Sequence, residues 1–458
     1  MTPLEALASW ASGVARADVP AEQHALVRLR LIDTIGLIAA AAGHPAGESL
    51  LGWARANPGT GATMLPTGAS AAPAVAALTH GSLAHARDFD DTFPDTVVHP
   101  GSTVVAATLA AAEARNASFD ELATAVVVGY EIAARLGVAA GRRFHARGFH
   151  ATGIVGPIAA AGAAGRILGL GGGTMADAFG LATSMSSGLL AFLADGGWSK
   201  WLHTGWSAHG GLVAAELASH AFRGPRHALD HRYGLYGAFL GAADARLDLI
   251  TAELGRTWLG AAAQPKHFPC AHVIQPYIEA VLAWRGQGRI RAAGIQSIRC
   301  VLAPWALPIV AEPRETKTAP RNDLEAIASL PFMVAAAACD GRVDLATLAP
   351  ETLGRADIHA LATRVTCEGD ATLGAGFDGC IEATLADGGR LDAKVALTPS
   401  SQERVVTKFR ANTSHLRRAA CAELETALLH EKPACRTLVQ LAAAAMTSGN
   451  SAPELRVT

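Results

Sequence analysis

Lysine is the scarcest charged residue in this sequence, with six lysines against 32 arginines. Only Lys200 and Lys266 fall within the first 316 residues. A preference for arginine is typical of GC-rich coding, so a lysine that persists indicates a need for a compact, titratable ammonium group. Lys200 lies among tryptophans, glycines and histidines in GGWSKWLHTGWSAHGG, and Lys266 lies in QPKHFPCAH. Both are therefore candidate functional cations.

The sequence also lacks an excess of charge of either sign. A formal net charge of -2 provides no general attraction to nucleic acid or to an anionic membrane, so we expect a small-molecule partner. The N-terminal residues contain no basic region ahead of an apolar run, unlike a secretory signal. The most apolar stretch, residues 151–173, is rich in Gly and Ala and contains Arg166, which favours a buried helix over a membrane span. We expect a soluble, cytoplasmic protein.

Paired cysteine motifs are absent as well. The seven cysteines are scattered and form no CxxC pair, which argues against a disulfide framework and against a zinc knuckle. No HExxH motif is present either. These absences argue against a zinc site, and we interpret Cys270 as a packed residue rather than a nucleophile.

The hydrophobic periodicity predicts a mainly α protein with two domains. Apolar residues recur every three or four positions in the segments 25–43, 72–88, 102–116, 119–137 and 211–224. Strand-like runs occur at 295–303, 364–369 and 380–397, and the last contains the turn Asp387-Gly388-Gly389. We predict a large all-helical domain built from residues 1–267 and 400–458, and an inserted α+β lid domain at 268–399.

The segment HARDFDDTFPDTVVHPGS, residues 85–102, concentrates four aspartates between two histidines. It resembles the DDxxD-type magnesium motif of helical terpenoid synthases, but Pro94 interrupts the helix and no second acidic motif follows. A solvated acidic loop is a second interpretation. The third is a proton-transfer site, because a helix beginning after His99 would turn its free backbone amides toward an anion.

Five segments together resemble the MmgE/PrpD superfamily, which includes 2-methylcitrate dehydratases, cis-aconitate decarboxylases and an iminodisuccinate epimerase. They occur in the family's order and are the segment at 85–102, GFHATGIVGPIAAAGAAGRILGL at 148–170, SKWLHTGWSAHGGLVAAELA at 199–218, PKHFPCAH at 265–272 and LEAIASLPFMVAAAACDG at 324–341. The resemblance implies a helical domain from both chain ends, an inserted α+β lid, a homodimer, and a pocket between the domains that needs no metal or cofactor.

The resemblance also implies a set of site residues. The proposed catalytic residues are Asp88, His99, His150, Lys200 and Lys266. The proposed substrate-binding residues are Asp91, Thr92, His203 and His272. The loop from Asp88 to His99 is one residue longer than in the decarboxylases, which leaves the register of His99 open, and the register of His272 is open too.

These residue types suit chemistry beside a carboxylate. Removing a proton from that carbon builds enolate-like charge that Lys200 and Lys266 can stabilise. His99 and His150 can remove or return the proton. We hypothesise that Asp88 bonds an imidazole and fixes its tautomer, as the acid of a hydrolase triad does.

Three reactions and one non-enzymatic function stay open. The sequence predicts a lyase acting on a small di- or tricarboxylic acid, and we place dehydration of a 2-methylcitrate type first because of its frequency in the family. Decarboxylation of a cis-aconitate type and epimerisation of an imino-diacid are the alternatives. A non-catalytic carboxylate-binding protein is the alternative from another class.

Overall fold

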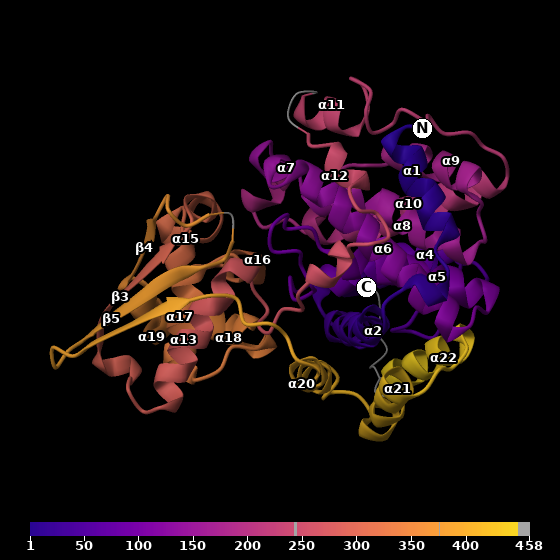
Figure 1. Ribbon diagram of the computed structural model, residues 1–458. Helices are drawn as coiled ribbons and strands as arrows, with labels where there is room; N and C mark the ends of the chain where they lie inside the picture. The colour runs from indigo at the N-terminus through magenta and orange to yellow at the C-terminus, as the bar shows by residue number, and fades with distance from the viewer. Residues whose placement is uncertain (242–244, 375, 448–458) are drawn as a thin grey trace.

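The computed structural model describes residues 1–241, 245–374 and 376–447. The described residues form 22 α-helices, one two-stranded sheet and one four-stranded sheet. The prediction of a mainly α protein is confirmed. Figure 1 shows most helices gathered on one side and the four-stranded sheet with its helices on the other, with α20 between them.

The helical part is built from residues at both ends of the chain. Its long helices enclose one hydrophobic core to which the N-terminal 263 residues and residues 405–446 contribute. They are α1 (Pro3–Gly13), α2 (Ala21–Ala41), α3 (Pro45–Ala56), α4 (Pro73–His85), α5 (Pro100–Arg115), α6 (Phe119–Ala140), α8 (Ala151–Ile167), α9 (Gly172–Thr183), α10 (Ser199–Ser219), α20 (Gln402–Asn412), α21 (Arg418–His430) and α22 (Cys435–Thr447). Shorter elements are α7 (Arg143–Ala146), α11 (Leu235–Leu240), α12 (Asp248–Thr251), β1 (Ala62–Thr63) and β2 (Ser70–Ala71).

Helix α6 is the one described helix that is long and apolar enough to cross a membrane by length and composition. However, 94% of its most apolar window is buried inside the protein. It packs as a core helix against α5 and α8.

Glycines bring α4 and α10 into backbone contact. A Cβ atom added at Gly205 of α10 would lie 2.1 Å from the carbonyl oxygen of Leu78 in α4. A Cβ atom added at Gly81 of α4 would lie 2.9 Å from the Cα atom of Gly205. This close approach fixes the first turn of α10, which carries Lys200, against the C-terminal end of α4, which carries His85.

The α+β part has its own core. Its sheet has the strand order β4-β3-β5-β6, in which β3 (Ile295–Leu302) is parallel to β4 (Val365–Gly369) and antiparallel to β5 (Gly379–Leu385), and β5 is antiparallel to β6 (Arg390–Val395). Its helices are α13 (Gln275–Gly286), α14 (Leu307–Val310), α15 (Arg314–Thr318), α16 (Asp323–Ile327), α17 (Leu330–Asp340), α18 (Pro350–Leu353) and α19 (Ala356–Ala362). The second core draws on residues 270–395 and on Phe192 from the helical part.

Candidate active site

The acidic segment forms a folded turn between α4 and α5. Asp88 adopts a left-handed conformation with φ of 46°, and Thr92 pairs with Gln264 in an antiparallel bridge. Phe93 and Val98 close a tight turn through a 2.9 Å backbone hydrogen bond. His99, the N-cap of α5, thereby lies with its Nδ1 atom 3.2 Å from the hydroxyl of Thr92. The turn brings Thr92 and His99 together.

Asp88 pairs with both candidate lysines. Its Oδ1 atom lies 2.7 Å from the Nζ atom of Lys200 and 2.8 Å from that of Lys266. Lys266 also donates to the backbone carbonyl of Asp88 over 2.7 Å. The hypothesis that Asp88 bonds an imidazole is therefore wrong: the left-handed backbone turns this carboxylate toward the ammonium groups, and its oxygen is taken by them.

The two ammonium groups control the charge state of Asp88. Burial alone would raise the pKa of its carboxyl group, but Lys200 and Lys266 outweigh burial and hold that pKa far below its usual range. Burial lowers the pKa of Lys200, and Asp88 opposes this change. Two ammonium groups thus share one carboxylate oxygen, so this part of the site offers two adjacent cations to a substrate carboxylate.

Asp90 is the acid that bonds imidazoles. Its carboxylate lies 2.9 Å from the Nδ1 atom of His85 and 3.2 Å from the Nδ1 atom of His99. Burial would raise the pKa of Asp90, but these two histidines hold it well below the usual range. An ionised Asp90 favours a proton on each Nδ1 atom, which leaves each Nε2 atom as an acceptor.

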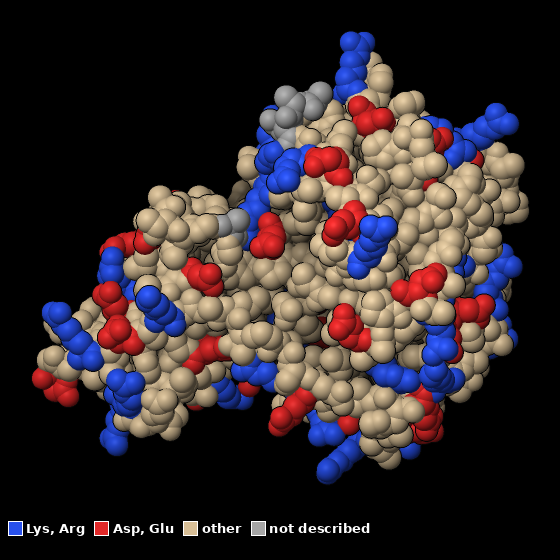
Figure 2. All heavy atoms as spheres, in the orientation of Figure 1, with Lys and Arg blue, Asp and Glu red and all other residues tan. Residues whose placement is uncertain are grey.

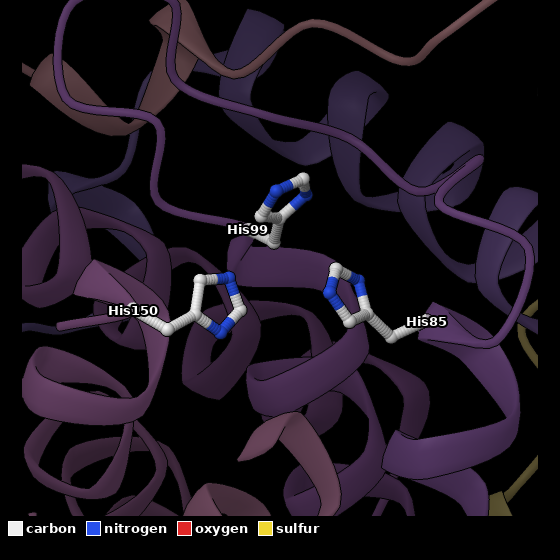
Figure 3. Close-up of side chains that lie close together, drawn as sticks. All are labelled: His85, His99 and His150. Atoms are coloured by element: carbon white, nitrogen blue, oxygen red, sulfur yellow. The ribbon is translucent and has the colours of Figure 1, made fainter. Parts of the chain in front are cut away.

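His150 completes a cluster of three imidazoles. It is the N-cap of α8, and its ring centroid lies 5.5 Å from that of His85 and 5.9 Å from that of His99. Figure 3 shows the rings of His85 and His150 facing each other beside His99. On its other side, the Nδ1 atom of His150 lies 3.2 Å from the Nδ1 atom of His203 on α10.

Burial keeps several of these imidazoles neutral. It lowers the pKa of His85 to about 4, against the opposing effect of Asp90, and lowers the pKa of His203 to about 4. The pKa of His150 falls well below its usual value through burial and the neighbouring histidines. The Nε2 atoms of His85 and His150 are buried and have no hydrogen-bond partner within the described part of the chain.

Asp91 faces away from the cluster. Its carboxylate accepts hydrogen bonds from the Tyr130 hydroxyl at 2.7 Å and from the Gly101 backbone N–H at 2.8 Å. Burial raises its pKa to about 7. We expected a free helix start after His99 and a substrate-binding Asp91; instead Asp91 satisfies an amide of the first turn of α5, and we interpret it as a structural residue.

His272 lies at the edge of the site. It is buried, its ring centroid is 5.3 Å from that of Phe377, and neither ring nitrogen has a hydrogen-bond partner among the described residues. Burial lowers its pKa well below the usual value, and Lys266 and His99 add to this effect. The α+β part thus contributes an imidazole close to Lys266.

Sequence reasoning missed His85, Asp90 and His145. His85 and Asp90 belong to the same acidic segment, but its spacing does not say which carboxylate turns toward which ring. His145 precedes His150 by five residues, and its ring centroid lies 5.8 Å from that of His150. Burial lowers the pKa of His145 to about 3, so it too is a neutral imidazole.

A separate cavity of about 880 Å³ lies on the other side of the acidic segment, where Phe89, His267, Arg404 and Lys408 line it. None of the clustered histidines, Lys200 or Lys266 lines this cavity. The chemistry described above therefore belongs to the buried cluster and not to that cavity.

Two family models match the chain: the MmgE/PrpD N-terminal domain over residues 5–248 and the MmgE/PrpD C-terminal domain over residues 268–430. The chain is 26% identical over 306 residues to a cis-aconitate decarboxylase from Aspergillus terreus, covering 64% of this chain and 62% of that protein. It is 27% identical over 380 residues to the cis-aconitate decarboxylase of Homo sapiens, covering 75% and 73%. The chain therefore spans less than two thirds of the length of the first of these relatives.

Proposed function

Because this chain belongs to the MmgE/PrpD family, we propose that it is a cofactor-free lyase that acts beside a carboxylate of a small polycarboxylic acid. The observation that supports this most is the joint arrangement of Asp88 with Lys200 and Lys266 beside the imidazoles of His99 and His150. It combines anion binding with proton transfer in one buried place.

The pair of Lys200 and Lys266 suits a carboxylate substrate. Lys200 and Lys266 both contact one oxygen of Asp88, so two ammonium groups lie side by side in the site. A substrate carboxylate placed there would interact with both ammonium groups in a buried environment, where a charge pair is worth more than it is in water. Thr92 and His272 are the neighbouring groups that we propose for further substrate oxygens.

Among the three candidate reactions, we now place decarboxylation first. The relatives named above are called cis-aconitate decarboxylases, whereas dehydration rested on family frequency alone. In such a reaction the bond from a CH₂ carbon to its carboxylate breaks, and its electron pair forms a new double bond. The electron pair of the former double bond forms a C–H bond at the carbon beside another carboxylate, with a proton that an imidazolium donates. The carboxylate that was cleaved off leaves as CO₂.

Dehydration and epimerisation use the same groups in another order. In dehydration a neutral imidazole removes the proton and hydroxide departs, while in epimerisation the proton returns to the opposite face. A carboxylate-binding protein without catalysis is the alternative of another class. It predicts tight binding of the acid with no change to the acid.

We also propose a homodimer, as the resemblance implies. Trp198, Leu202 and Trp206 are 46%, 45% and 41% exposed and follow one another along successive turns of α10. Such an apolar stripe beside Lys200 and His203 suits contact with a second copy of the chain. On the face drawn in Figure 2, basic and acidic side chains are mixed.

The test is proton NMR of chelator-treated protein in D₂O with cis-aconitate, 2-methylcitrate, citrate and a chiral imino-diacid. Loss of CO₂ from cis-aconitate is the expected result. Loss of water, or deuterium entry beside a carboxylate without other change, would assign dehydration or epimerisation instead. Binding of an acid without any turnover would support the non-catalytic alternative.

The matched variants are His99→Gln and His150→Gln, with His220→Gln as control because His220 is exposed at the far end of α10. Each site variant should lower kcat by roughly 10²-fold or more, as expected for loss of a general acid or base, while the control keeps the full rate. Unchanged rates in both site variants would refute the assignment.

A further inference from the structure

We propose that His85, His99 and His150 form a binding site for one divalent transition-metal ion of the zinc type, and that its occupation shuts off proton transfer. One ligand nitrogen from each ring lies within 4.8 Å of the other two, and all three residues are buried. This site would be inhibitory, since two of its ligands are the imidazoles proposed above to move protons.

The geometry is close to what such an ion needs. A tetrahedral zinc site holds imidazole nitrogens about 2.0–2.1 Å from the metal, which places two nitrogens roughly 3.4 Å apart. The present separations exceed this only moderately, and small rotations of the rings would close the difference. Figure 3 shows the three rings coming from separate elements and lying around one point.

Asp90 orients two of the three ligands. Its carboxylate lies beside the Nδ1 atom of His85 and the Nδ1 atom of His99, which leaves their Nε2 atoms as acceptors. Metal-bound histidines commonly donate their second ring N–H to a carboxylate, and this contact strengthens them as ligands. Here one carboxylate performs that task for two rings at once.

An independent observation indicates that a ligand belongs between the rings. The Nε2 atoms of His85 and His150 are buried and have no hydrogen-bond partner among the described residues. Buried polar atoms are normally satisfied. A metal ion between the two rings would satisfy both nitrogens in a single step.

The ligand set also predicts the kind of ion. Three imidazoles suit Zn²⁺, Co²⁺ or Ni²⁺, whereas Mg²⁺ and Ca²⁺ prefer sets of oxygen ligands. No cysteine belongs to the cluster. Mg²⁺ therefore serves as a negative control in every measurement.

The first experiment titrates the chelator-treated full chain with Zn²⁺ by calorimetry and with Co²⁺ by absorption spectroscopy. We expect one ion per chain and the d–d bands of nitrogen-ligated Co²⁺ in low coordination. Thiolate charge-transfer bands would place the ion on cysteines and overturn the proposal, as would no binding at all. Since these signals do not depend on turnover, they test the metal site even if the proposed reaction fails.

Variants locate the site. His85→Gln should abolish the stoichiometric binding, and Asp90→Asn should weaken it by about 10- to 100-fold, as expected when the carboxylate that accepts the ligands' second ring N–H is lost. The control His220→Gln should bind as the unmodified chain does. If His85→Gln does not fold, Asp90→Asn still tests the site. Full Zn²⁺ affinity in both folded variants would refute the site.

Activity provides the last readout. Zn²⁺ should inhibit turnover with an apparent constant equal to the calorimetric one, and chelator should restore the rate, while Mg²⁺ leaves it unchanged. Stimulation of turnover by Zn²⁺, or tight binding at this cluster without inhibition, would contradict the inhibitory role.

Discussion

At the scale of single residues, two aspartates of one segment bind two different kinds of cationic or titratable group. Asp88 forms ion pairs with Lys200 and Lys266, and Asp90 contacts the imidazoles of His85 and His99. The left-handed backbone at Asp88 turns these two carboxylates to different partners. Two kinds of chemistry are thereby built from five consecutive residues, DFDDT.

Replacing Asp90 by Asn tests its role as a positioning residue. The amide cannot accept from two Nδ1–H groups with the strength of a carboxylate, so the histidines lose their preferred tautomer. We expect kcat to fall by roughly 10²-fold with a small change in KM, and Asp90→Glu to restore part of the rate. Steady-state kinetics with the reacting acid measures both, and a rise in KM at constant kcat would contradict the assignment.

The pH dependence follows from the neutral imidazoles. Burial holds the pKa of His85 and His203 at about 4 and that of His150 well below 6.5, so these three imidazoles are neutral in the free site at neutral pH. A bound polycarboxylate adds negative charge and raises these values. The pKa in the profile of kcat should therefore lie above that in the profile of kcat/KM. For decarboxylation, kcat should fall as pH rises through that value, and the reverse order of the two values would count against this account.

Some of this site could be predicted from residues alone. Lys200 and Lys266 are conspicuous because lysine is rare, and they do meet at one carboxylate. The different partners of Asp88 and Asp90 could not be predicted, because they depend on the left-handed backbone conformation of one residue. His85 escaped notice because nothing in the sequence shows that the last turn of α4 faces the N-terminus of α8.

At the scale of helices and strands, the periodic patterns predicted the long elements well. The segments at 102–116 and 119–137 correspond to α5 and α6, and the segment at 295–303 corresponds to β3. Two other apolar runs, at 324–339 and 346–362, are each divided between shorter helices. The first divides into α16 and α17 before Pro331, and the second divides at Pro350 and Gly354. In both, a residue that disfavours helix interrupts a pattern that burial alone would continue.

The contact between α4 and α10 yields a prediction at this scale. Gly205→Ala places a methyl group against the Leu78 carbonyl and the Ser82 side chain, so α10 must shift. We expect a loss of stability of about 1–3 kcal/mol, as for an overpacked core, together with a lower rate because Lys200 moves. Thermal unfolding and kinetics measure the two effects.

Gly173→Ala is the matched control, because a Cβ atom at this helical glycine of α9 meets nothing within 4 Å. It should leave the rate unchanged and the stability equal or slightly higher, since alanine favours the helix. If the two variants have equal stability and equal rates, the close approach of α4 and α10 contributes to neither.

At the scale of the whole molecule, two hydrophobic cores meet at the site. The first core is built in part by α4, α5 and α8, at whose ends His85, His99 and His150 lie, and the second is the core of the α+β part, which carries His272. The chain passes between the cores near residue 266 and again near residue 400. The first passage is part of the site, since Lys266 lies in it; the second contains Pro399, Ser400 and Ser401 and carries none of the site residues. Periodicity cannot reveal this difference, because it arises only when Gln264 pairs with Thr92.

Limited proteolysis with a protease of broad specificity tests both the predicted domain limits and this asymmetry. Thr398, Pro399 and Ser401 are exposed, whereas Lys266 is 1% exposed and tied to Asp88. Cleavage should therefore begin near residue 400, with the segment at 264–268 cut much later, because proteases attack accessible, weakly held backbone. Asp88→Asn removes the charge that holds Lys266, so it should speed cleavage at 264–268 and leave cleavage near 400 unchanged. Mass spectrometry of the fragments over time reads both rates, and early cuts inside either core would show that the domain limits at 267 and 400 are wrong.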